Sequence, residues 1–121
     1  MNIVSLDQLG FEAFAPLVKT KWLVEPGTAG ALELELAAVT PRRLISSGGA
    51  GGVTYEQFAL ELLGPNDRLL PQRIYWFEAP ALGRFELFIV PVGRDAQGIR
   101  YEAAFNRPVP AQWPPPAADS R

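Results

Sequence analysis

The segment from Phe85 to Phe105 constrains the fold more than any other part of this chain. It holds two stretches in which apolar and polar residues alternate, separated by a short polar loop bounded by glycine. A period of two is typical of strands that bury one face, so the segment predicts a β-hairpin. The inward residues are odd-numbered in both strands, and pairing them requires a loop with an odd number of residues. We therefore expect a five-residue loop near 93–97.

The preceding strand, expected at 73–78, predicts a second apolar surface. If Phe85 faces the core opposite Phe77, the even-numbered residues of both strands point the other way. Those outward residues are apolar too: Ile74, Trp76, Phe88 and Val90. Both faces of this hairpin then need cover, which the N-terminal segment is expected to provide for one.

The remaining pattern predicts one mainly β domain. The six expected strands lie near 21–25, 31–39, 54–63, 73–78, 84–92 and 99–106. A short helical segment over 5–18 precedes them, with Ser5 as its cap and Pro16 limiting its extent. We expect a small antiparallel six-stranded barrel with meander-like connections, or alternatively a two-sheet sandwich.

Two segments are not expected to belong to the core. The stretch 46–52, SSGGAGG, is expected to be a flexible loop between two strands. The chain divides into a domain over 1–106 and a Pro-rich tail over 107–121, since five of its fifteen residues are proline.

Composition excludes several chemistries. The chain has no Cys and no His, which removes thiolate metal sites, the usual neutral-pH base and a Ser-His-Asp triad. The glycine-rich stretch lacks the Lys of a phosphate-binding loop. Six glutamates could support carboxylate catalysis, but each is expected to face outward or lie in a loop: Glu33, Glu35, Glu56, Glu61, Glu86 and Glu102. We expect no catalytic residue, metal or cofactor.

Charge and hydropathy bear on whether nucleic acid or a membrane is an expected partner. The net charge is −2, and the eleven basic residues are scattered except for Arg42 and Arg43, which we interpret as a solvated strand end. Nucleic acid is therefore not an expected partner. No apolar run is long enough to span a membrane, and the N-terminus lacks a basic region, so no membrane partner and a cytoplasmic location are expected.

These observations favour a non-enzymatic protein-interaction or assembly module, either self-associating or binding another protein. Its candidate interface comprises Ile74, Trp76, Phe88 and Val90, together with Trp113 of the Pro-rich tail. Two alternatives stay open. One is a barrel that binds a small ligand in an interior cavity, and the other is a carboxylate-dependent hydrolase with two acids in a cleft.

Residues 6 to 106 resemble a family of small uncharacterised bacterial domains, a domain of unknown function. The resemblance rests on FALELLGPNDRLLPQRIYWFEAPALG from Phe58, on FELFIVPVG from Phe85 and on YEAAFN from Tyr101. The segment FAPLVKTKW over 14–22 is also similar, with Lys19 at the position where the family pattern has glycine. The family is similar to proteins encoded beside phage-tail-collar-like genes, which implies an accessory role in such assemblies. No functional residue is implied.

Overall fold

A computed structural model describes residues 3–47 and 52–109. A 3-10 turn (Leu6–Gln8), helix α1 (Phe11–Phe14) and a second 3-10 turn (Ala15–Leu17) open the chain. Seven antiparallel strands follow, β1 (Lys21–Val24), β2 (Leu32–Val39), β3 (Arg43–Ser47), β4 (Val53–Gly64), β5 (Arg73–Ala79), β6 (Gly83–Asp95) and β7 (Gly98–Pro108).

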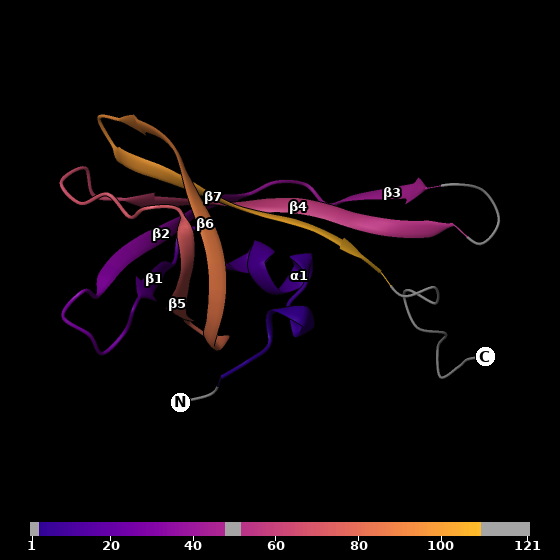
Figure 1. Ribbon diagram of the computed structural model, residues 1–121, viewed down its shortest axis with the longest axis horizontal. Coiled ribbons are helices and arrows are strands. Elements are labelled where there is room, and N and C mark those ends of the chain that lie inside the picture. Colours follow the sequence, from indigo (N-terminus) through magenta and orange to yellow (C-terminus); the bar gives the residue numbers. More distant parts are fainter. Residues whose placement is uncertain (1–2, 48–51, 110–121) are drawn as a thin grey trace.

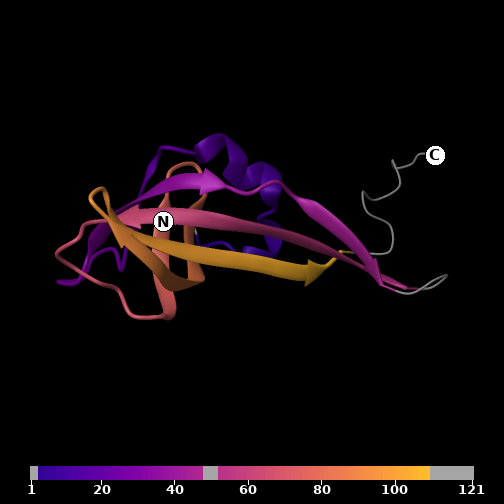
Figure 2. The same cartoon turned by 90° about the horizontal axis from the view of Figure 1, so that it is seen from above.

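The seven strands form one sheet whose order is β2-β1-β5-β6-β7-β4-β3. Strand β2 also pairs with β4, which closes six of the strands into a ring and leaves β3 outside it. The mainly β class, the antiparallel pairing and the short N-terminal helix are confirmed. The ring is only approximately a barrel, because β4 and β7 continue beyond it and carry β3 as an arm, as Figures 1 and 2 show.

The expected meander is wrong at one connection. Strand β4 does not pair with β5, since β7 and β6 lie between them. Residues 65–72 cross the end of the ring instead, and Leu70 is buried there. Its backbone N–H donates to the Tyr101 hydroxyl at 3.0 Å, which fixes the crossing segment against β7.

Strand β3 was not expected, and the loop expected over 46–52 is wrong for residues 46 and 47, which belong to this strand. It pairs with β4 from Arg43 opposite Gln57 to Ser47 opposite Val53. The physical reason is the length of β4: its pairing with β2 ends at Leu60, and the rest of the same edge is free to accept another strand. Residues 48–51 lie outside the described ranges.

The β6–β7 hairpin reaches the expected parity by another route. Asp95 pairs with Gly98, so the connection is a two-residue turn and not the five-residue loop expected. The register then shifts between Pro91 and Gly93. This bulge supplies the extra residue that brings odd-numbered side chains of both strands to the inner face. The inward set is confirmed by burial of Phe85, Leu87, Ile89, Ile99, Tyr101, Ala103 and Phe105.

Strand β7 ends at Pro108, two residues beyond the expected end at 106. Its final residues pair only with β4, from Phe105 opposite Phe58 to Pro108 opposite Tyr55. The pairing of β7 with β6 stops at Glu102, so no neighbour on that side requires the N–H that proline lacks.

Helix α1 fills the inside of the ring. Phe14 is fully buried, and its ring centroid lies 5.6–6.3 Å from those of Trp22, Phe58, Phe85 and Phe105. Figure 1 shows α1 lying beside β6 and under β4. The N-terminal segment therefore covers the inner face of the β5–β6 hairpin and leaves its outer face bare.

Candidate interaction surface

The outer face of β5 and β6 carries the largest side chains among the exposed apolar residues. Ile74 lies directly opposite Phe88, and these residues are 55% and 47% exposed. Trp76 is 37% exposed and lies opposite Glu86. Val90 is only half-buried. The structure thus brings four of the five predicted interface residues onto one face, and Trp113 lies outside the described residues. We call this surface the β5–β6 face.

Two further apolar residues border this face and were not predicted. Val92 is 58% exposed and lies at the bulge between Pro91 and Gly93, at the end of the strand expected over 84–92. Leu23 of β1 is 36% exposed and pairs opposite Glu78 of β5, which places it beside the same face. The alternation of Trp22, Leu23 and Val24 could have predicted that Leu23 faces outward. It could not have predicted that β1 lies next to β5.

The β5–β6 face contains both signs of charge. Arg84 Nε lies 3.5 Å from Glu78 Oε1, and Glu86 is exposed in the row next to them. Arg73 does not belong to this face, since it lies opposite the buried Ile89 and its guanidinium carbon is 4.1 Å from the centroid of the buried Tyr75 ring. The apolar centre is therefore bordered by one arginine and two glutamates.

The expectation that all six glutamates face outward or lie in a loop is wrong for Glu56. This residue is buried, with 7% of its surface exposed. Its number has the parity of the inward residues of β4, which is the signal that sequence analysis overlooked. Arg42 Nε donates to its Oε2 at 2.9 Å, and Arg107 Nε lies 3.5 Å from its Oε1. Arg42, interpreted as solvated, is thus part of an internal ion cluster.

Arg107 connects this cluster to the N-terminal segment. Its two terminal nitrogens donate to the backbone carbonyls of Leu6 and Leu9. Its guanidinium carbon also lies 5.1 Å from the centroid of the Phe105 ring. A cleft of about 410 Å³ opens beside it and includes Asp7 and Glu12. Both oxygens of Glu56 face arginine, so this cluster fixes the N-terminal segment to the ring and leaves neither oxygen of Glu56 free.

The other glutamates lie on the outer surface. Glu61 accepts a hydrogen bond from Arg100 Nη1 at 2.9 Å and lies directly opposite Glu102. Glu33 and Glu35 border a shallow cleft beside Lys21. Among residues 3–47 and 52–109, no three His, Cys, Asp or Glu side chains gather where they could hold a metal ion.

The carboxylate of Asp95 lies in the β6–β7 turn and has a lowered pKa. The Gln97 backbone N–H donates to Asp95 Oδ1 at 2.8 Å, and Arg100 Nε donates to Oδ2 at 3.1 Å. The turn hydrogen bond, then Arg100, lower the pKa of Asp95. The carboxylates of Asp95 and Glu61 in turn raise the pKa of Arg100. These contacts account for the turn and require no catalytic role.

No helix in the described ranges has the length and apolar content needed to cross a membrane. Residues 9–105 match the model of a family described as a domain of unknown function, DUF6916. This match confirms the resemblance to such a family. No curated protein and no solved structure matches the chain.

Proposed function

We propose that this chain, which belongs to the DUF6916 family, is a non-enzymatic assembly module that pairs with a second copy of itself through the β5–β6 face. The observation that carries the proposal is the exposure of Ile74, Trp76, Phe88 and Val92 on adjacent strands. Contiguous apolar surface of this kind is uncommon on a monomer and is typical of contact surfaces.

The charges of the face favour a second copy over an unrelated protein. In a two-fold interface the same patch meets itself, so it must be self-complementary. An apolar centre can pair with its own copy, and a border with both arginine and glutamate can match opposite signs across the axis. A face with a single sign of charge would repel its copy.

The two alternatives have less support. Phe14, Trp22 and Phe85 occupy the inside of the ring, where an interior ligand would have to bind. For a hydrolase, the buried candidate acid is Glu56, and its two oxygens already face arginines.

The test is the molar mass of the full chain by light scattering over a concentration series. We expect a dimer that dissociates on dilution. Phe88→Glu should give a monomer, because a charge would be buried in the apolar centre of the interface. Leu44→Glu is the matched control, since Leu44 is a 54% exposed apolar residue on β3, and this variant should remain dimeric.

A monomer at all concentrations would contradict self-association. Equal loss of the dimer in both variants would place the interface elsewhere. Circular dichroism should show that both variants keep the β fold, because both positions are exposed on strands.

A further inference from the structure

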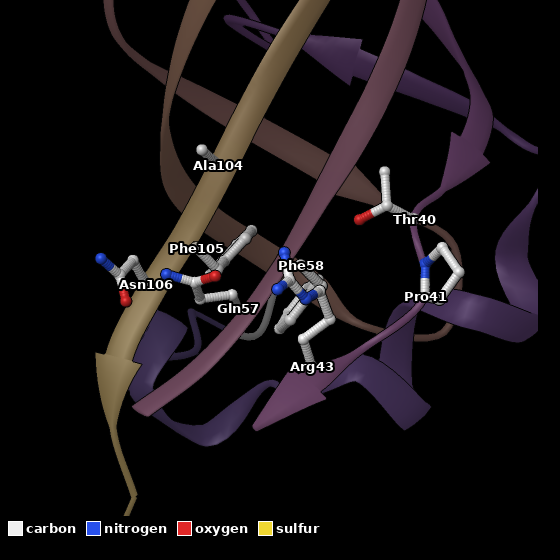
Figure 3. A pocket seen from close by; sticks show the side chains of 8 residues that line it. All are labelled: Thr40, Pro41, Arg43, Gln57, Phe58, Ala104, Phe105 and Asn106. Atoms are coloured by element: carbon white, nitrogen blue, oxygen red, sulfur yellow. The ribbon is translucent and has the colours of Figure 1, made fainter. Parts of the chain in front are cut away.

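A groove lies where β4 and β7 continue beyond the ring and β3 pairs with β4. It has a volume of about 450 Å³ and is formed by Thr40 and Pro41 after β2 and by residues of β3, β4 and β7. Figure 3 shows Gln57 and Asn106 on the outer surface of β4 and β7, with Pro41 across from them. The volume is within the range of small-molecule sites.

Three polar side chains form a row across this groove. Arg43 of β3 pairs with Gln57 of β4, and Gln57 pairs with Asn106 of β7. Directly opposed residues share one face of a sheet, so a guanidinium and two amides are neighbours at strand spacing. In Figure 3 the Arg43 side chain extends from β3 over β4 toward Gln57.

Arg43 differs from the other arginines of the described chain. Each of the others has an ion pair, a hydrogen bond or a ring contact: Arg42, Arg68, Arg73, Arg84, Arg94, Arg100 and Arg107. Within residues 3–47 and 52–109, Arg43 has none, and the Gln57 and Asn106 side chains make no hydrogen bond either. The groove thus presents a row of donors and acceptors without partners.

The positive charge of the groove favours a ligand with a negatively charged group. Arg43 is the sole charged residue among those that line it, although the chain as a whole has a net charge of −2. A guanidinium binds a carboxylate through two parallel hydrogen bonds. Side-chain amides both donate and accept, so they suit a neighbouring amide group of the ligand. Thr40, Pro41 and Ala104 add a mostly apolar wall.

We propose that this groove binds a small organic acid that carries an amide next to its carboxylate. Arg43 holds the carboxylate, and Gln57 and Asn106 bond the amide. The site is independent of the β5–β6 face, because it uses β3, β4 and β7.

The experiment is an NMR titration of the ¹⁵N-labelled full chain with N-acetylaspartate. Acetate, N-methylacetamide and inorganic phosphate test the carboxylate, the amide and an unrelated anion separately. We expect N-acetylaspartate to bind most tightly, with shifts confined to residues 40–43, 57–58 and 104–106. Arg43→Gln should weaken its binding about tenfold, because the charge-assisted hydrogen bonds are lost.

The matched control is Arg94→Gln, which removes the same charge from an exposed site outside the groove and should leave the affinity unchanged. Arg43→Lys should be intermediate, since it keeps the charge and loses the two-pronged geometry. Equal binding of phosphate and N-acetylaspartate, or equal weakening by both Gln variants, would overturn the proposal. Binding of an aspartate-containing peptide without binding of N-acetylaspartate would contradict the proposal that the ligand is a small molecule.

Discussion

Replacement of Arg107 by methionine tests whether the internal ion cluster fixes the N-terminal segment to the ring. The variant keeps most of the apolar stem and removes the bonds to the Leu6 and Leu9 carbonyls and the contact with Glu56. Each hydrogen bond from a charged donor contributes about 1.5–3 kcal/mol. The side chain is 24% exposed, so the lower end applies to both bonds. We expect a loss of about 3 kcal/mol in the free energy of unfolding.

Urea unfolding followed by tryptophan fluorescence, to which the buried Trp22 contributes, measures this loss. In a domain of this size it corresponds to a fall of about 12 °C in Tm. Hydrogen exchange gives the local readout, because the Leu9 N–H that donates to the Leu6 carbonyl should lose protection first. Arg94→Met is the control, since Arg94 also bonds a carbonyl but at an exposed site. A loss below about 1 kcal/mol for Arg107→Met, or one equal to the control, would refute the reasoning.

Three further predictions concern the core and the β6–β7 turn. Phe14→Ala should lower the free energy of unfolding by about 3–5 kcal/mol in urea titrations, because Phe14 is fully buried; a loss below about 1 kcal/mol would mean that the helix does not support the ring. Gly98→Ala should cost about 2–3 kcal/mol by the same assay, since Gly98 has φ of 147° and an added Cβ would collide with the Gly64 carbonyl; a neutral result would argue against this turn. The Asp95 carboxyl should titrate below the usual aspartate pKa in NMR, so its contribution to stability is present at neutral pH and disappears as pH falls through that lowered pKa. Arg100→Gln should raise the pKa of Asp95 only part of the way to the usual aspartate value, because the backbone hydrogen bond from Gln97 is the larger cause of the lowering. A complete return to the usual value would show that Arg100 is the larger cause.

The alternation of residues determined the side-chain directions in this protein. Odd-numbered residues of β6 and β7 face the core even though their loop has two residues and not five. Burial requires one apolar face, and a bulge can absorb an error in loop length without changing that face. The pairing of Phe77 with Phe85 was correct for the same reason. The apolar outer face of this hairpin followed from the same parity.

The strand order was decided by tertiary structure. Closure of β2 onto β4 and the crossing from β4 to β5 depend on contacts between residues far apart in the chain, which local alternation does not encode. Strand β3 can form because β4 extends beyond its pairing with β2. No alternation of apolar and polar residues in 43–47 predicted this strand.

The two proposed sites differ in the same way. The exposure of Ile74, Trp76 and Phe88 was predicted from the sequence. Side chains alternate between the two faces of a strand, so once Phe77 and Phe85 are placed in the core, these three residues must lie on the outer face. The Arg43 groove and the Glu56 cluster were not predicted, because each joins side chains from separate strands. Parity alone could have placed Glu56 inward, but its arginine partners come from the β2–β3 connection and from β7. Periodicity sets which way a side chain points, and strand pairing sets what it meets there.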